Sequence, residues 1–442
     1  MTPTIERHDI DVPRFAPTRL ISHGMILRGP SRKPVGTSHA TAYELGHCLQ
    51  LDARHCLLLA SLDEQGGGDL CVGNDAFVFE RLSDIQADSA ISVNRVETDY
   101  QLPNGRGSAF LAKFPAMAGF VPLGARLEGG ADHPGAGTGF LICSCVTFSA
   151  DKTSAIEAPE TFLELIQIRW DGVKVEFFDP VYVRQLLGMP LSGDKILSPF
   201  CPQDQGLLVA LGVSGQGIGV FRFEFDGQRW AAVTHGRPFC TNPEADRPTQ
   251  PGEPWKRAPG EVEPSLRRAR DRYVLFTRGI DPIGRLYEST DGLNYRLVLE
   301  RPNVTVPQVL NQGLDGSLYL ATNPGPGWLR NPLVAYDFLT ADAAPEGMIL
   351  HDQDGVRDGD GPTIPFVDHA VSFNVLLDGQ WRHLVFYRVC DLKERTLHKF
   401  QLDQGQGKGI YGDQGPIEKR STTGLYLVEM EFERMADAPV LF

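Results

Sequence analysis

The sequence lacks long apolar runs and a basic surface signature. No stretch approaches the roughly 20 apolar residues that cross a bilayer. The net charge of −14 argues against nucleic acid or an anionic membrane as the main partner, because both require a basic footprint. The first thirty residues contain Glu6, Asp9 and Asp11 and no continuous apolar segment of the kind found in signal peptides. We therefore expect a soluble protein that is cytoplasmic, or secreted if a leader has been removed.

Several common catalytic and metal-binding motifs are also missing. The sequence contains no G-x-x-x-x-G-K-S/T phosphate loop, no H-E-x-x-H zinc motif and no G-x-S-x-G nucleophile elbow. Its eight cysteines form no C-x-x-C pair, and a chain of 442 residues can fold without disulfides or a structural metal. Apolar surroundings predict buried thiols at five of them, namely Cys48, Cys56, Cys71, Cys143 and Cys145.

Helical periodicity is scarce, whereas glycine (47) and proline (32) are plentiful. A 3.6-residue period is arguable only at Val181–Met189 and Glu160–Ile168. Elsewhere the chain shows short apolar runs in pairs or trios, separated by turn residues. The turns include five Asp-Gly pairs: Asp171-Gly172, Asp226-Gly227, Asp291-Gly292, Asp315-Gly316 and Asp378-Gly379. This pattern is typical of consecutive antiparallel hairpins.

The hairpins group into modules of roughly 40–65 residues, each with three or four strands, which favours an all-β propeller over a sandwich. We expect about six blades, beginning near residues 44, 107, 200, 262, 305 and 367, although five or seven would also fit. The alternating segment Leu425–Phe432 should pair with the N-terminal segment and close the ring. We expect one domain over residues 1–442, with a Pro- and Gly-rich insertion between blades near 242–260.

The fourth module contains two recognisable motifs. Its segment Ser289-x-Asp291-Gly292-x-x-Tyr295 resembles the Asp-box of the sialidase-like (BNR repeat) propellers, with tyrosine in place of the usual tryptophan and without the spacer before glycine. Glu263-Pro264-Ser265-Leu266, followed by the strand that ends at Arg278, resembles the blade opening of sialidase-like glycosidases. The resemblance covers about forty residues. It implies a propeller that acts on carbohydrate.

The position of Asp291 predicts where a ligand binds. Asp291 falls on the hairpin between the third and fourth strands of its module, and its carboxylate should accept backbone N–H bonds across the turn. We interpret it as a turn-forming residue. A funnel for the ligand should lie on the opposite face, where the first strand of each blade begins.

Acidic and basic residues recur at that opposite face. Glu263, Asp368 and Asp204 are candidate catalytic carboxylates, because glycoside hydrolysis uses one carboxyl group as acid and another as base or nucleophile. Arg278 and Arg388 are candidate substrate ligands. The alternative is that each acid caps a strand or orients an arginine. Sialidases themselves use three arginines and a Tyr/Glu pair, and this sequence supplies Tyr387 but no full set.

Histidines allow a second chemistry. Some propellers act on uronic-acid glycans by elimination or hydrolysis with one histidine, which serves as a base near neutral pH. His47, placed at the opening of the first blade, is the candidate catalytic histidine. Four further residues complete the predicted substrate site: His369, His235, Arg237 and Trp328.

An acidic loop raises the question of a metal. Asp352-x-Asp354-Gly355 and Asp358-x-Asp360-Gly361 carry oxygen ligands at alternate positions, as Ca²⁺ prefers, but lack the spacing of an EF-hand and its distal glutamate. We expect no required cofactor, with Ca²⁺ at these four aspartates as the alternative to a solvated turn.

The sequence thus predicts a glycoside hydrolase that acts on an oligo- or polysaccharide at the funnel. A lyase or histidine-dependent glycosidase for uronic-acid glycans is one alternative, and a non-catalytic glycan-binding propeller is another. Fold alone does not decide among them. The sequence predicts no nucleic-acid or membrane partner, and it leaves the oligomeric state, the sugar and the linkage open.

Overall fold

The fold is a ring of β-sheets in a computed structural model of the chain. The structure describes residues 10, 12–28, 42–63, 71–95, 97–101, 108–122, 137–149, 163–183, 187–188, 191, 201–203, 206–213, 216–239, 261–279, 283–302, 304, 306–324, 330–337, 347–353, 364–392 and 422–433. Within these residues, no helix is long and apolar enough to cross a membrane. The insertion predicted near 242–260 lies outside them.

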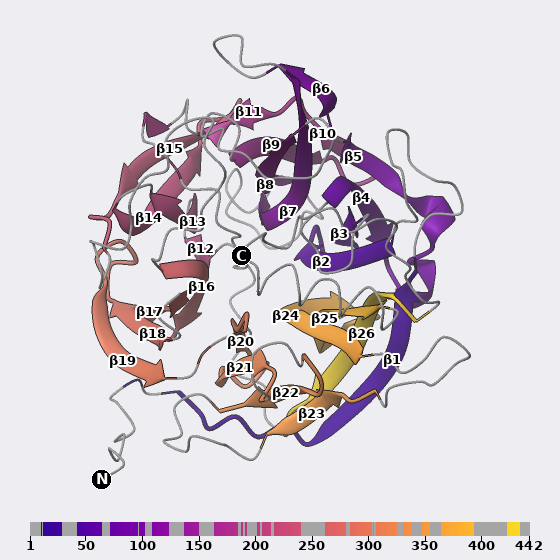
Figure 1. Cartoon of the computed structure of the whole chain (residues 1–442), viewed down its shortest axis with the longest axis vertical. Coiled ribbons are helices and arrows are strands. Elements are labelled where there is room, and N and C mark those ends of the chain that lie inside the picture. Colours follow the sequence, from indigo (N-terminus) through magenta and orange to yellow (C-terminus); the bar gives the residue numbers. More distant parts are fainter. Residues whose placement is uncertain are drawn as a thin grey trace.

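Six antiparallel blades make up the ring (Figure 1). Blade 1 consists of β2 (Ala42–Gln50), β3 (Cys56–Asp63), β4 (Cys71–Phe79) and β5 (Ile91–Arg95). Blade 2 consists of β7 (Ser108–Pro122), β8 (Gly137–Ser149), β9 (Leu163–Trp170) and β10 (Val175–Phe177), with β6 (Glu97–Gln101) on β7 and β11 (Val181–Tyr182) on β9. Blade 3 consists of β12 (Cys201–Gln203), β13 (Gly206–Val213), β14 (Gly217–Phe225) and β15 (Trp230–His235).

The second half of the ring repeats this order. Blade 4 consists of β16 (Glu261–Ala269), β17 (Arg272–Gly279), β18 (Ile283–Ser289) and β19 (Arg296–Pro302). Blade 5 consists of β20 (Val309–Gln312), β21 (Leu318–Thr322), β22 (Leu333–Tyr336) and β23 (Met348–His351). Blade 6 consists of β24 (Ile364–Leu377), β25 (Gln380–Leu392), β26 (Gly424–Glu431) and β1 (Arg19–Leu27).

The predicted propeller of six blades is therefore confirmed. Its first strands begin within four residues of the predicted blade starts, and they lie closest to the centre of the ring (Figure 1). The predicted closure is also confirmed, because β1 pairs antiparallel with β26 and completes blade 6. The sequence allowed a helix at Glu160–Ile168 and at Val181–Met189. That prediction was wrong for most of the first segment and for the start of the second, which are β-strands. Leu163–Trp170 is strand β9 and Val181–Tyr182 is strand β11, because pairing within blade 2 overrides the local pattern.

The middle strands are buried on both faces because each blade packs between two neighbours. Every residue of β3 and of β13 is buried, whereas β19, at the outer edge of blade 4, is mostly exposed. This arrangement explains why the sequence shows continuous apolar runs where a one-sided sheet would show alternation. Each Asp-Gly turn joins two strands of one blade, and Asp378 and Gly379 both have positive φ (51° and 74°), as a two-residue hairpin requires.

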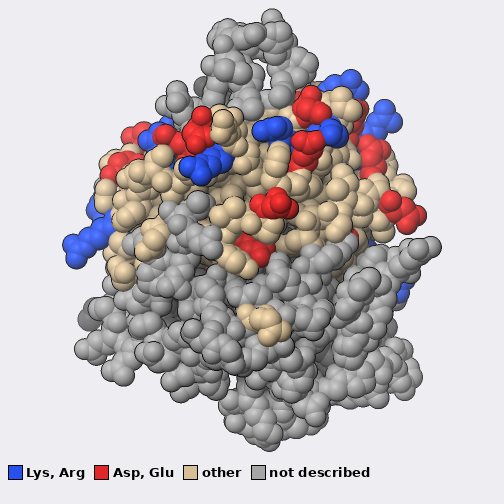
Figure 2. Space-filling model, turned by 90° about the horizontal axis from the view of Figure 1, so that it is seen from above, with Lys and Arg blue, Asp and Glu red and all other residues tan. Residues whose placement is uncertain are grey.

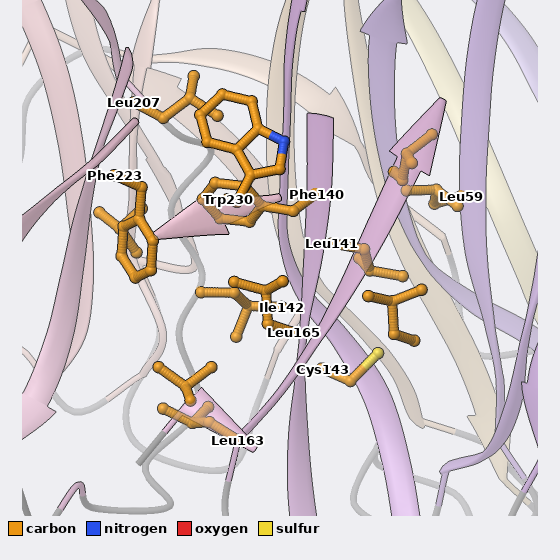
Figure 3. Close-up of a cluster of buried hydrophobic side chains, with 14 of the residues drawn as sticks. Leu59, Phe140, Leu141, Ile142, Cys143, Leu163, Leu165, Leu207, Phe223 and Trp230 are labelled. Carbon is orange, nitrogen blue, oxygen red and sulfur yellow. The ribbon is translucent and has the colours of Figure 1, made fainter. Parts of the chain in front are cut away.

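Apolar layers fill the spaces between successive blades. In Figure 3, Phe140 from β8 lies between Trp230 and Phe223 of blade 3, with ring centroids 5.0 and 5.1 Å apart. Similar buried clusters join blades 3 and 4, 4 and 5, 5 and 6, and 6 and 1. The described cysteine side chains are buried free thiols, which confirms the prediction for Cys48, Cys56 and Cys143.

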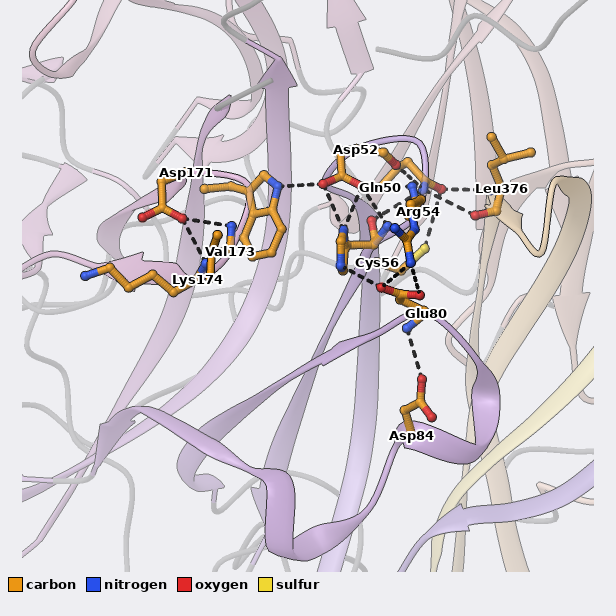
Figure 4. Close-up of polar contacts among 12 residues, drawn as sticks. Gln50, Asp52, Arg54, Cys56, Glu80, Asp84, Asp171, Val173, Lys174 and Leu376 are labelled. Atoms are coloured by element: carbon orange, nitrogen blue, oxygen red, sulfur yellow. Dashed lines mark hydrogen bonds and ion pairs between the residues drawn. The ribbon is translucent and has the colours of Figure 1, made fainter. Parts of the chain in front are cut away.

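Amide side chains connect the innermost strands to one another. Gln50 of blade 1 forms two hydrogen bonds with the backbone of Leu376 in blade 6: its Oε1 accepts from Leu376 N at 2.8 Å and its Nε2 donates to Leu376 O at 3.3 Å (Figure 4). Asn311 of blade 5 likewise accepts from Ser372 N at 2.8 Å and donates to Ala370 O at 3.1 Å. Side chains thus supply the bonds between backbones that belong to different sheets.

Replacing Asn311 with alanine should lower the free energy of unfolding by about 2–3 kcal/mol, because two buried backbone groups would lose their partners. Asn311 is 0% exposed, so water cannot substitute for its amide. Chemical denaturation followed by tryptophan fluorescence measures the change. Asn294→Ala is the control, since the Asn294 amide also makes a hydrogen bond but is exposed. Equal losses in the two variants would contradict the inter-blade role.

Candidate functional site

Blades 4 and 6 share an irregularity near the start of their first strands. The register of β16 against β17 shifts between Val262 and Ser265, and that of β24 against β25 shifts between Asp368 and Val371. The first residue inside each shift has a left-handed backbone, with φ of 56° at Glu263 and 53° at His369. Positive φ is uncommon for residues other than glycine and is concentrated at functional sites. The two blades therefore repeat one bulge that redirects polar side chains.

An arginine on the second strand completes each repeat. Arg278 of β17 donates from Nε and Nη2 to the carboxylate of Glu263, at 2.7 and 2.8 Å. Arg388 of β25 donates from Nε and Nη2 to the carboxylate of Asp368, at 2.7 and 2.8 Å. Both are two-pronged pairs, the geometry in which an arginine and a carboxylate bind most strongly. The structure thus brings together four of the residues predicted for the site.

Further charged residues from blades 1 and 5 join Asp368 and Arg388. Arg330, which precedes β22, forms an ion pair with Asp368. Glu44 of β2 lies 3.4 Å from Arg388, measured from Oε2 to Nη1. Arg330 also interacts electrostatically with Glu263, which connects the two halves. We call these six residues the ion-pair cluster: Glu44, Glu263, Arg278, Arg330, Asp368 and Arg388.

The charge state of Asp368 follows from its neighbours. Burial would raise the pKa of this carboxyl, but Arg388, His369 and Arg330 outweigh burial and hold the pKa well below its usual value. His369 is one of these neighbours because its Nδ1 lies 2.8 Å from Asp368 Oδ1. Asp368 is therefore ionised and cannot donate a proton to a leaving group. It is suited to act as a base or to fix the orientation of Arg388 and Arg330.

The cluster has an inner and an outer part. The side chains of Arg388 and Glu44 are 0% exposed, whereas those of Arg278 and Arg330 are 10% and 20% exposed. Arg278 and Arg330 are therefore more accessible to solvent than Arg388 and Glu44. Figure 2 shows one face of the molecule, and acidic and basic side chains are interspersed on the described part of that face.

Sequence reasoning missed three residues of this region: Glu44, Arg330 and Glu261. Glu261 precedes the bulge of β16 and accepts hydrogen bonds from Tyr287 Oη at 2.6 Å and Thr277 Oγ1 at 2.8 Å. Glu44 lies in a register shift of β2 between Tyr43 and Leu45, at the place where β16 and β24 also shift, but this irregularity is visible only in the structure. No local pattern identifies Arg330, which is connected to Asp368 only by the packing of blade 5 on blade 6.

The sequence predicts that His47 opens the first blade, and the structure shows that it does not. Strand β2 begins at Ala42, so His47 lies in the middle of the innermost strand and is 4% exposed. Burial, together with the smaller effects of the charges of Arg267 and His369, lowers its pKa to about 4. The imidazole is therefore neutral near pH 7. Its catalytic role stays a prediction.

Three predicted substrate ligands lie apart from the ion-pair cluster. His235 and Arg237 are exposed and lie at the end of β15, the outer strand of blade 3, where His235 Nδ1 is 2.9 Å from Gly236 O. Tyr387 is 1% exposed and lies beside His351, with its hydroxyl 3.1 Å from Nδ1 of that imidazole. Adjacent residues on a strand point to opposite faces, so Tyr387 faces away from the site that Arg388 joins.

Five predicted site residues lie outside the part of the chain that the structure describes: Asp204, Trp328, Asp354, Asp358 and Asp360. Asp352 is described, and its Oδ1 accepts a hydrogen bond from Asn331 Nδ2 at 3.1 Å. Over the described ranges, no group of three or more His, Cys, Asp or Glu side chains is arranged to hold a metal ion. The Ca²⁺ site at the four aspartates stays a prediction.

The turn at Ser289–Tyr295 has the predicted structural role. Asp291 Oδ1 accepts hydrogen bonds from the backbone N–H groups of Leu293 and Asn294, both at 2.8 Å, and Gly292 has a φ of 76°. Partial burial would raise the pKa of Asp291, but the bonds from Asn294 and Leu293 lower it below its usual value. Asp171 and Asp226 make the same backbone bonds in the corresponding turns of blades 2 and 3.

The chain is a six-bladed β-propeller similar to those of sialidases. Solved structures that resemble it include Trypanosoma rangeli sialidase in complex with the inhibitor DANA, at 8% identity and a TM-score of 0.48 over 94% of this chain and 60% of that one. A Dyadobacter fermentans protein of unknown function matches at 12% identity and 0.48, over 94% of this chain and 99% of its own. The Hadza microbial sialidase Hz136 matches at 9% and 0.42, over 89% and 66%.

No model of a known protein family matches the chain, and no curated protein matches it. The chain spans about 60% of the length of the trypanosomal sialidase. The six-bladed propeller itself is established by the strand pairing of the chain. What the site does chemically depends on its own residues, because likenesses at these identities and TM-scores carry no argument about function.

Proposed function

We propose that the chain is a glycoside hydrolase that binds a glycan at the funnel, over the ion-pair cluster. The observation that carries this proposal is the repeated bulge of blades 4 and 6, where a left-handed residue accompanies a buried carboxylate–arginine pair. Backbone strain of this kind costs of order 1–3 kcal/mol per residue and persists where the surrounding structure enforces it. Such strain, together with buried charge at a funnel, supports a site selected for function over stability.

The burial of each charged group suggests its role. Arg278 and Arg330 are the partly exposed members and would contact the polar groups of the sugar. Glu263 would fix Arg278, and Asp368 would fix Arg330 and Arg388, so that the guanidinium groups are held in place before the substrate arrives. Glycoside hydrolysis also needs a protonated acid, a role for which ionised Asp368 is unsuited. Asp204 is our candidate for that acid.

Replacing Glu263 with glutamine should lower kcat/KM on the cognate glycan about 100-fold, the scale of loss that follows removal of one positioned polar group from an active site. The variant removes the charge that holds Arg278 and preserves the shape of the side chain. A panel of chromogenic glycosides and natural glycans, neutral and acidic, identifies the substrate before the variants are compared. Glu263 is preferable to Asp368 for this test, because Asp368→Asn would weaken two buried arginine pairs at once.

Glu176→Gln is the matched control, since Glu176 lies on β10 at the outer edge of blade 2 and pairs only with exposed Lys174 among the residues described. We expect it to retain the wild-type kcat/KM. An unchanged rate in Glu263→Gln would contradict the proposed role of the cluster. A product that absorbs ultraviolet light would identify elimination in place of hydrolysis, and tight binding without any product would identify a glycan-binding module.

A further inference from the structure

The segment that carries Arg330 is fixed against the innermost strand of blade 6. Arg330 lies between β21 and β22 and belongs to neither strand. Its carbonyl accepts a hydrogen bond from Val367 N at 2.8 Å. Val367 directly precedes Asp368 on β24, so this backbone bond lies next to the ion pair that Arg330 forms with Asp368. The placement of the two charged side chains therefore depends on the contact between these two segments.

Asn323 strengthens the same contact with its side chain. It directly follows β21 and is 5% exposed. Its Nδ2 donates to Pro332 O, in the segment of Arg330, and to Val367 O, both at 2.9 Å. An asparagine amide nitrogen carries two N–H groups, and these two bonds use both. Val367 is thus held at its N–H by Arg330 and at its carbonyl by Asn323.

The Arg330 side chain meets β24 beside this junction. Its guanidinium lies over the Phe366 ring, 5.5 Å from the centroid, and pairs with Asp368. Phe366 and Asp368 flank Val367, and residues at alternate positions of a strand project to the same face. An arginine side chain is long and flexible, so its head group keeps one position only if its backbone and its partners keep theirs. A shift of the segment would carry the guanidinium away from Asp368.

We propose that Asn323 is a positioning residue for Arg330. Its amide holds residues 330–332 against β24 and so sets where the guanidinium meets Asp368 and the substrate. The effect on turnover rests on the proposed glycan site, whereas the position of Arg330 can be measured without a substrate. The alternative is that Asn323 only fastens blade 5 to blade 6, as Asn311 does.

A double-mutant cycle separates these two roles, with the glycan that the substrate panel identifies. Asn323→Ala should lower kcat/KM about 10- to 100-fold, since a displacement of about 1 Å in an active site can cost roughly 100-fold. If Asn323 acts through Arg330, the double variant Asn323→Ala with Arg330→Met should be no slower than Arg330→Met alone. Losses that multiply in the double variant, or an unchanged kcat/KM in Asn323→Ala, would overturn the proposal.

Asn374→Ala is the matched control. Asn374 also joins blades 5 and 6, because its Nδ2 donates to Gln312 O at 3.4 Å, but it lies six residues along β24 from Asp368. That spacing is about 20 Å in an extended strand. We expect Asn374→Ala to retain the wild-type kcat/KM. An equal loss in Asn323→Ala and Asn374→Ala would reveal a general loosening between blades and would overturn the positioning role.

Chemical labelling of arginine tests the same role without a substrate. Phenylglyoxal reacts with accessible guanidinium groups, and mass spectrometry of peptides from the labelled native protein gives a rate for each arginine. Arg330 should react several-fold faster in Asn323→Ala than in the wild type, and at the wild-type rate in Asn374→Ala. Arg229, whose side chain is 77% exposed, should react equally in all three proteins. Asn323→Ser keeps one donor and should give a smaller increase, and it replaces Asn323→Ala if the alanine variant does not fold.

The two measurements fail in different ways. If the wild-type protein turns over none of the glycans, the proposed hydrolase function fails, and the labelling rates still decide the role of Asn323. If Arg330 reacts no faster in the Asn323 variants than in the wild type, the positioning role is wrong, whatever the protein hydrolyses.

Discussion

Replacing Arg388 with methionine should lower the free energy of unfolding by about 3–5 kcal/mol, the loss expected when one partner of a buried ion pair is removed. The Arg388 side chain is 0% exposed and forms a two-pronged pair with Asp368, while Glu44 lies 3.4 Å away. The variant would take Arg388 away from the buried carboxylate of Glu44 and would leave Asp368 with Arg330 and His369 beside it. Urea denaturation followed by the fluorescence of the five tryptophans measures the loss.

Two companion variants separate burial from charge. Arg229→Met removes an arginine whose side chain is 77% exposed and whose nearest carboxylate, Asp226, is 3.7 Å away, so it should cost no more than about 1 kcal/mol. The double variant Arg388→Met with Asp368→Leu should recover part of the loss, because it also removes one of the two buried carboxylates whose charge Arg388 balances. If Arg388→Met costs as little as Arg229→Met, the cluster is not the buried network that the structure shows.

Lowering the pH from 8 to 5 should remove roughly 4 kcal/mol of stability through two histidines. Burial lowers the pKa of His383 to about 3 and that of His47 to about 4, whereas an unperturbed histidine has a pKa of about 6.5. Between these values the unfolded chain binds a proton at each imidazole and the folded chain does not, so stability rises with pH in that window. At pH 5 each histidine contributes a loss of about 2 kcal/mol.

The measurement is the pH dependence of urea denaturation at constant ionic strength. His383→Gln should flatten the slope between pH 4 and 6.5 by about one proton. His235→Gln, at an exposed histidine of β15, should keep the wild-type slope. Asp368 affects stability in a lower pH range than the two histidines. The pKa of its carboxyl is lowered in the folded protein, so the stability that it contributes is present above the usual pKa of 3.8 and is lost as the pH falls below that value. An equal slope in wild type and His383→Gln would contradict the prediction.

The architecture was predictable because its signals are local. Asp-Gly turns and continuous apolar runs located the hairpins, and the spacing of hairpins located the blade starts to within four residues. The pairing of Glu263 with Arg278 could also be anticipated, since both residues belong to one hairpin and to one recognisable motif. Asp368 and Arg388 followed from the same position two blades later.

The rest of the site depends on contacts that no local pattern reveals. Glu44 and Arg388 are 344 residues apart in the chain and meet only because the ring closes. Arg330 meets Asp368 through a connection within blade 5 that has no motif. His47 was misplaced because its strand begins five residues earlier, at Ala42, so that a residue expected at the start of the strand lies buried in the middle of it. His235 was misplaced because the exposed end of an outer strand resembles a loop in sequence.

The pairing of β1 with β26 also governs the order in which the molecule can form. Thr18 donates to the carbonyl of Glu431 across 413 residues of chain, so the last blade cannot be completed during most of synthesis on the ribosome. The entropy of joining such distant segments grows only with the logarithm of their separation, but the step must wait for both. Until then β25 presents an unpaired edge, which is the state in which a β-protein is most exposed to association with another chain. Blade 6, which carries Asp368 and Arg388, is thus the part of the site that matures last.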